Sequence, residues 1–223
     1  MRNSATIGKR VGYGWLYNFY AVETGTLAPT GWRVPTQTEV VDLINHLPGG
    51  TGGAGRLKST REEWKRPNTS ATNEYLFSAL PAGQRFGVFG EFIELREYAH
   101  FWASTPYSTN SGRIYNLHYN SGTISTSYTN KYVGRSVRCI QDKGSGESNG
   151  DMGTLTDIDG NVYGWIVIGD YRWMTENLRT KHLNTGVYIV ERPMAADWVS
   201  IENTARCAYN NDHYLVYPPG KNI

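Results

Sequence analysis

The sequence predicts an α+β protein in which short strands and long loops surround one clear helix. Aromatic residues make up 13% of the chain and 25 residues are glycine. Rings can fill much of a core built from short strands, and glycine permits the tight turns between them. Most apolar stretches are short and β-prone, and one has helical spacing. With 223 residues, the chain can form one large domain or two small ones.

The first third of the chain contains the predicted helix. Residues 12–22, GYGWLYNFYAV, are aromatic and predict a core strand. Thr36 and Glu39 then form a capping box, since each side chain can satisfy a free backbone N–H of the first helical turn. Apolar residues follow at helical spacing until Pro-Gly-Gly at 48–50. Residues 49–90 predict mostly loops, including GGTGGAG, which lacks the pattern of a phosphate-binding loop.

The segment 101–142 is dense in Tyr, Asn, Ser and Thr. Residues 113–119 and 123–128 flank Asn-Ser-Gly and predict a hairpin, and a hydrophobic-basic strand at 136–140 closes the segment. Tyr, Ser and Asn form adaptable recognition surfaces because their contacts cost little entropy. The segment therefore predicts a display surface, with the wet face of an ordinary β protein as the alternative.

The predicted ligand contacts all lie within this segment. Because side chains alternate along a strand, only about half of them can face outward on one side. They are Tyr107, Asn110, Arg113, Tyr115, Asn116, His118, Tyr119, Asn120, Tyr128, Asn130 and Tyr132.

Residues 142–153, DKGSGESNGDMG, predict a flexible linker because they are rich in Gly and Ser and have no apolar period. Beyond it, 154–156 and 162–168 predict strands on either side of a DIDGN turn, and a further strand follows at 171–174. The DxDGN string resembles the start of a calcium loop, but the rest of such a loop is missing. The sequence therefore predicts a hairpin turn here and no metal site.

Cys139 and Cys207 are the two cysteines of the chain. They lie far apart in sequence without a CxxC spacing, which makes a zinc site a poor interpretation. One disulfide and two separate buried thiols remain equally open. No histidine lies at HExxH spacing. We therefore expect no catalytic residues and no cofactor.

Charge and hydropathy limit the partners. Lys+Arg number 22 and Asp+Glu 20, so the charge balance gives no reason to expect a nucleic-acid partner, and none is predicted. No stretch approaches the roughly 18 apolar residues of a membrane span, so no membrane insertion is expected. The first ten residues lack an apolar signal region. That pattern is compatible with a mature extracellular, cell-surface or virion protein and with an intracellular one.

Several strings resemble the Fibrobacter succinogenes major paralogous domain family. They include YGWLYNFYAV, GWRVPTQTEVVDLINHL, FWAST, SVRCI and DIDGNVYGWIVIGDYRWMTENLRT, and with shorter matches they cover most of the chain. The resemblance implies a C-type-lectin-like fold: an antiparallel sheet with one or two helices and long irregular loops. Such domains occur in bacterial surface and secreted proteins. They are related in fold to formylglycine-generating enzymes and to the variable proteins of diversity-generating retroelements.

The order of the blocks departs from the family, in which the DIDGN block comes first. Here residues 154–223 correspond to the N-terminal part of the family domain and residues 1–141 to its C-terminal part, joined through 142–153. We expect one circularly permuted domain, since a linker of this length spans roughly 15–20 Å. A swapped dimer or fibre is the alternative. The resemblance also places Cys139 and Cys207 where members often carry cysteine, which favours their being neighbours.

These observations predict a non-enzymatic binding or adhesion domain for a protein or carbohydrate ligand on a cell surface. A retroelement-diversified or phage receptor-binding protein is one setting for it. One alternative is a structural fibre or decoration subunit that assembles as a homo-oligomer. The other is a copper oxidase of the formylglycine-generating type that uses both cysteines. Calcium-dependent sugar binding is not expected, because the carboxylate ligands are missing.

Overall fold

The computed structural model describes residues 12–86, 89–199 and 202–218. These residues form a mixed α+β structure with mostly antiparallel sheets and few helices, which confirms the predicted class. The sequence-based statement about a signal region concerns residues 1–10, which lie outside the described part of the chain. Within that part, every helix is too short or too polar to traverse a lipid bilayer.

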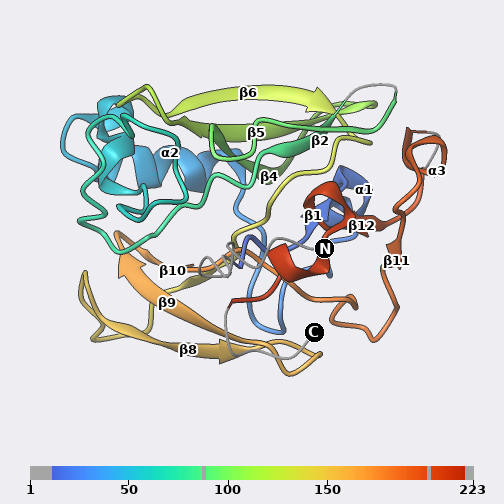
Figure 1. Ribbon diagram of the computed structural model, residues 1–223. Coiled ribbons are helices and arrows are strands. Elements are labelled where there is room, and N and C mark those ends of the chain that lie inside the picture. The colour runs from blue at the N-terminus through green and yellow to red at the C-terminus, as the bar shows by residue number, and fades with distance from the viewer. Residues whose placement is uncertain (1–11, 87–88, 200–201, 219–223) are drawn as a thin grey trace.

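Two antiparallel sheets lie on the upper and lower sides of the molecule in Figure 1. The upper sheet has the order β4-β5-β6 and consists of β4 (Tyr98–Ser108), β5 (Ser111–His118) and β6 (Ser125–Asn130). The lower sheet has the order β7-β10-β9-β8 and consists of β7 (Ile140–Asp142), β10 (Tyr171–Met174), β9 (Val162–Ile168) and β8 (Met152–Thr156).

Shorter elements complete the fold. A small sheet has the order β1-β12-β11, and a second pairs β2 with β3. Their bounds are β1 (Leu16–Tyr17), β12 (Ala205–Cys207), β11 (Val190–Glu191), β2 (Gln84–Phe86) and β3 (Glu91–Ile93). The helices are α1 (Phe19–Glu23), α2 (Gln37–His46), α3 (Ala195–Val199) and the 3-10 helices η1 (Gly50–Arg56), η2 (Tyr209–Asn211) and η3 (His213–Leu215).

Helix α2 confirms the predicted capping box. The Thr36 hydroxyl accepts a hydrogen bond from the Glu39 backbone N–H, and the Glu39 carboxylate accepts one from the Thr36 N–H at 2.7 Å. Val40, Leu43 and Ile44 are buried and pack with apolar side chains of both main sheets. The helix therefore fills the space between the two sheets at one end of the molecule.

The predicted strand at 12–22 is wrong over most of its length. Only β1 is extended, and α1 begins directly after Asn18. The buried Asn18 side chain accepts a hydrogen bond from the Ala21 N–H at 3.1 Å and caps α1. A helix cap thus ends a run whose aromatic composition predicts a strand. The glycine-rich segment at 49–56 also differs from prediction, because it forms η1 rather than a flexible loop.

The two predicted hairpins are confirmed. β5 and β6 flank the Asn-Ser-Gly turn at 120–122, and β8 and β9 flank the DIDGN turn at 157–161. The predicted closing strand at 136–140 is mostly irregular: Ser136 makes an isolated bridge to Phe101, and β7 begins only at Ile140.

Residues on both sides of 142–153 share sheets and core. Strand β7 pairs with β10, and β1 pairs with β12. One buried cluster contains Trp102 from the first block and Tyr163 from the second. The intervening segment is itself tied to the lower sheet, since the Arg172 guanidinium donates to the Glu147 carboxylate at 2.8 Å.

Buried cations hold the irregular segments in place. The guanidinium of Arg138 is fully buried and donates to the backbone oxygens of Ser78 at 2.9 Å and Met174 at 3.0 Å. Its Nε donates to the Asn177 side chain at 2.7 Å. Backbone carbonyls left free by irregular chain need donors when they are buried. One guanidinium in the predicted closing strand supplies several of them.

Candidate functional site

Two exposed tyrosines form a stacked pair on the upper sheet. The ring centroids of Tyr107 in β4 and Tyr128 in β6 are 3.7 Å apart, and the angle between the ring planes is 6°. The two residues are 47% and 52% exposed, respectively. The Arg113 guanidinium lies over the Tyr107 ring at 5.1 Å. Stacking and the cation fix the rings before any ligand arrives, which lowers the entropy lost on binding.

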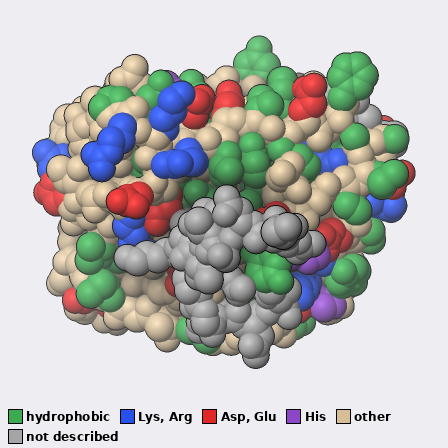
Figure 2. Space-filling model, in the orientation of Figure 1, with side chains coloured by type: hydrophobic (Ala, Val, Ile, Leu, Met, Phe, Trp, Pro, Cys, Tyr) green, Lys and Arg blue, Asp and Glu red, His purple; other side chains and the backbone are tan. Residues whose placement is uncertain are grey.

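Further polar side chains lie at the same end of the sheet. Asn110 and Asn130 are exposed, and the Asn130 amide donates to the Tyr132 hydroxyl at 2.9 Å. We call Tyr107, Asn110, Arg113, Tyr128, Asn130 and Tyr132 the tyrosine-stack surface. Figure 2 shows hydrophobic side chains projecting from the upper rim, on the side where Figure 1 places this sheet.

A second group of predicted residues lies at the other end of β5. The His118 ring contacts the Tyr119 ring with centroids 4.6 Å apart, the Lys65 ammonium lies 4.9 Å from the Tyr119 ring, and Asn120 is exposed in the turn. Arg113 and His118 are separated by about 17 Å along the strand at the usual rise per residue. The predicted contacts therefore form two surfaces rather than one.

Lys58 fixes the position of this second group. It is buried, and its ammonium donates to the backbone oxygens of Thr69 at 2.7 Å, Ser121 at 3.0 Å and His118 at 3.1 Å. Burial lowers the pKa of Lys58 to about 8. At neutral pH the ammonium form therefore still prevails and supplies the three N–H donors.

Tyr115 and Asn116 lie between the two surfaces and are buried, which corrects the expectation that they contact a ligand. The Tyr115 ring is 1% exposed and stacks on Phe101 at 5.0 Å in the cluster formed with α2. Asn116 is 8% exposed and points to the opposite face of the sheet. The middle of β5 is covered on both faces of the sheet, so its side chains are shielded from solvent there whichever face they point to.

Asn116 belongs to a buried polar cluster that sequence reasoning missed. His100 contacts the Glu94 carboxylate through Nε2 and the Asn116 side-chain oxygen through Nδ1, both at 2.7 Å. Arg135 is buried nearby and donates to the same Asn116 oxygen at 3.4 Å. Burial and the Arg135 charge lower the pKa of His100 to about 4, although Glu94 opposes them. These residues are dispersed along the sequence and show no motif spacing.

The cysteines do not form the disulfide that was one of the two predictions. The structure has Cys139 and Cys207 as free, buried thiols. Burial raises the pKa of both thiols, that of Cys207 to about 12. Neutral buried thiols are weak metal ligands and weak nucleophiles. This arrangement does not favour the copper-oxidase alternative.

The DIDGN turn uses its carboxylates internally. Asp157 accepts hydrogen bonds from the backbone N–H groups of Asp159 and Asn161, both at 2.9 Å, and from the Tyr163 hydroxyl at 2.6 Å. Asp159 accepts from the Thr180 hydroxyl at 2.7 Å. Within the described residues, no group of three or more His, Cys, Asp or Glu side chains could hold a metal ion. The hairpin-turn interpretation accounts for both aspartates.

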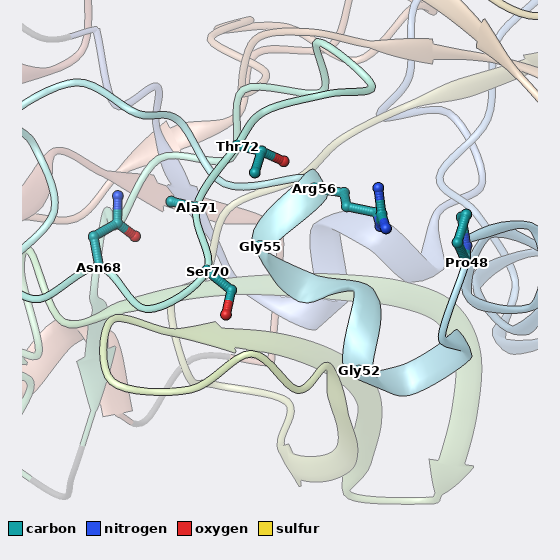
Figure 3. A pocket seen from close by; sticks show the side chains of 8 residues that line it. All are labelled: Pro48, Gly52, Gly55, Arg56, Asn68, Ser70, Ala71 and Thr72. Carbon is teal, nitrogen blue, oxygen red and sulfur yellow. The ribbon is translucent and has the colours of Figure 1, made fainter.

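A hollow of about 500 Å³ lies between η1 and the loop at 68–72. Figure 3 shows its lining residues, among which Arg56 alone is ionisable. The Arg56 guanidinium pairs with Glu74. The hollow therefore presents hydroxyl, amide and backbone groups without a set of side chains suited to catalysis.

Comparison with known proteins adds one finding. The family described as Fibrobacter succinogenes major domain matches residues 2–141. That match ends within β7, at the start of the predicted linker. No curated protein and no solved structure gave a significant match to the chain.

Proposed function

This chain belongs to the Fibrobacter succinogenes major domain family, and we propose that it is a non-enzymatic binding domain. Its tyrosine-stack surface recognises a protein or a carbohydrate on a cell surface. The observation that carries the proposal is the exposed, preordered pair Tyr107 and Tyr128 with Arg113 beside it. Exposed rings with little freedom to lose, next to adaptable amide and hydroxyl groups, are typical of recognition surfaces.

The chemistry of the remaining groups supports binding rather than catalysis. His100 is 5% exposed, and the carboxylate of Glu94 is engaged by His100 and Gln84. Both thiols are buried and free. An acid–base pair must reach the atom from which it takes a proton. The His100–Glu94 pair is instead built into the packing of the sheet.

The proposal includes a C-type-lectin-like fold in circularly permuted order. One observation supports a single shared domain in this order: residues beyond the linker pair with those before it through β7–β10 and β1–β12. An extracellular, cell-surface or virion location follows from the proposed ligand. Diversification by a retroelement is a further part of the proposal. It requires a near-identical template copy beside the gene, which the nucleotide sequence would reveal.

The experiment is to probe glycan arrays and bacterial cell surfaces with the purified chain and with a Tyr107→Ala/Tyr128→Ala variant. The wild type should bind a defined set of targets. The variant should lose that binding while its melting temperature changes little, since both rings are half exposed. Tyr214→Ala is the matched control, because Tyr214 is an equally exposed tyrosine outside the predicted contacts.

A Tyr119→Ala variant separates the two surfaces. Loss of binding in Tyr119→Ala, with binding retained in the double variant, would transfer the function to the second group. Retention of binding both in the Tyr107→Ala/Tyr128→Ala variant and in Tyr119→Ala would refute the proposal that either aromatic surface is the ligand site.

A further inference from the structure

Strand β6 forms an open edge of the upper sheet. Among the described strands it pairs only with β5, in the order β4-β5-β6, and Figure 1 shows it as the outermost strand on that side. The other edge, β4, is covered by bridges from Ala99 to Gly83 and from Phe101 to Ser136. Within the described residues, the backbone groups of 125–129 form hydrogen bonds only toward β5. Alternate N–H and C=O groups of β6 therefore point outward without a protein partner.

The sequence of β6 lacks the usual devices that protect an edge. Residues 123–130, TISTSYTN, contain no charged residue and no proline, and the β5–β6 register is continuous from Ser111 to Asn116 without a bulge. Thr and Tyr are strong strand formers. Natural sheets use charged residues, prolines, bulges or covering segments to prevent such edges from pairing with another strand. An uncharged, regular and exposed edge is a template for another strand.

The edge strand β8 of the lower sheet is different. Asp151 and Asp157 flank it directly. If two copies of β8 paired antiparallel about Thr154, Asp151 of one copy would lie opposite Asp157 of the other. Like charges directly opposite destabilise a strand pair. Self-pairing is therefore opposed at β8 and unopposed at β6, where residues 123–130 carry no charge.

We propose that two copies of this chain associate through antiparallel pairing of β6 with β6, which joins their upper sheets into one six-stranded sheet. The outward backbone N–H and C=O groups of β6 have the spacing needed to pair with another strand. When the partner is β6 of a second copy related by a twofold axis, the free N–H and C=O groups of both strands are satisfied in the same way. The inference does not depend on the ligand of the tyrosine-stack surface. It does place the two tyrosine stacks next to the twofold axis, where they form one paired surface.

The first test is the mass of the chain in solution as a function of concentration. The wild type should approach twice 25.0 kDa at high concentration and dissociate on dilution. Ser127→Lys/Thr129→Lys should remain monomeric, because in registers centred on Ser127 or on Tyr128 the introduced ammonium groups face each other. Met152→Lys/Thr154→Lys is the matched control on exposed positions of β8, and it should keep the dimer.

The second test locates the contact. In the two symmetric registers centred nearest the middle of β6, Ser127 or Tyr128 lies opposite its own copy, so one of the single variants Ser127→Cys and Tyr128→Cys should form a disulfide-linked dimer on mild oxidation. The native thiols are buried and should not cross-link. A wild type that stays monomeric at every concentration overturns the proposal. So does a β6 lysine variant that is folded, by circular dichroism and melting, and still dimeric.

Discussion

The upper and lower sheets are both antiparallel and both contain a hairpin, yet they use their polar residues differently. In the lower sheet, the β8–β9 turn is closed by Asp157, which accepts bonds from its own loop and from Tyr163. In the upper sheet, the exposed residues of β6 and Asn120 of the β5–β6 turn make few side-chain bonds within the chain. Polar groups already bonded internally stabilise the fold, whereas uncommitted ones remain free for a partner.

The same contrast exists within β5 itself. Arg113 and His118 toward its ends are half-buried, while Tyr115 and Asn116 in its middle are buried. Residue type does not distinguish these positions, since tyrosines occur in all three environments. What distinguishes them is α2, which covers one face of the strand, and the His100 cluster, which covers the other.

The largest expected effect comes from the buried tyrosine. Tyr115→Ala should lower the free energy of unfolding by about 3–5 kcal/mol, because it leaves a cavity in the cluster packed against α2. Tyr128→Ala should cost no more than about 1 kcal/mol, since it loses one exposed ring stack. Denaturant unfolding of both variants measures the difference.

Tyr115→Phe provides the control for that comparison. Among the residues that the structure describes, the buried Tyr115 hydroxyl has no hydrogen-bond partner, so its removal should leave the stability unchanged or slightly higher. A large loss in Tyr115→Phe would mean that the hydroxyl, and not ring packing, is what the position requires. Equal losses in Tyr115→Ala and Tyr128→Ala would abolish the distinction between buried and displayed tyrosines.

Local signals predicted the local structure well. The Thr36 and Glu39 capping box, the Asn-Ser-Gly hairpin and the DIDGN turn are each determined by a few neighbouring residues, and each forms as expected. The packing between segments distant in sequence could not be predicted from these local signals. Alternation correctly implies that only some β5 side chains face outward, but it cannot identify a strand that is covered on both faces in its middle.

The buried charges were the least predictable part. Lys58 and Arg138 look like ordinary surface cations in sequence, and their partners are mainly backbone carbonyls of loops up to 63 and 61 residues away. No side-chain motif records such a bond. The one basic residue inside the apolar string SVRCI, Arg138, was the only hint, since charged residues are rarely fully buried without a partner.

The next prediction concerns the pH dependence of the upper sheet. The folded pKa of His100, about 4, lies below the ordinary value of 6.5 because of burial and Arg135. The unfolded chain therefore binds the proton more readily, and stability should fall as pH decreases from 6.5 through 4, by roughly 3 kcal/mol. Glu94, whose pKa is lowered, adds a loss in the same direction at more acidic pH.

The measurement is the free energy of unfolding from pH 7 to pH 4 for the wild type and for His100→Gln, which cannot titrate. The variant should lack the part of the slope between pH 6.5 and 4.5 that belongs to His100. Arg135, Glu94 and Asn116 lie around the imidazole, and the substitution alters none of these three residues. Identical slopes would show that His100 titrates normally and that the cluster is hydrated.

The smallest of these effects separates the two hairpin turns directly. Asp157→Ala should destabilise the protein by about 2 kcal/mol, because it removes the acceptor for two backbone N–H groups and for the Tyr163 hydroxyl. Asn120→Ala in the exposed turn of the upper sheet should change stability by less than about 0.5 kcal/mol. Thermal unfolding of the two variants decides the point. If Asn120→Ala were as destabilising as Asp157→Ala, the polar side chain of the β5–β6 turn would be stabilising the fold as Asp157 does in the β8–β9 turn. The upper sheet would then have no free polar surface at that end.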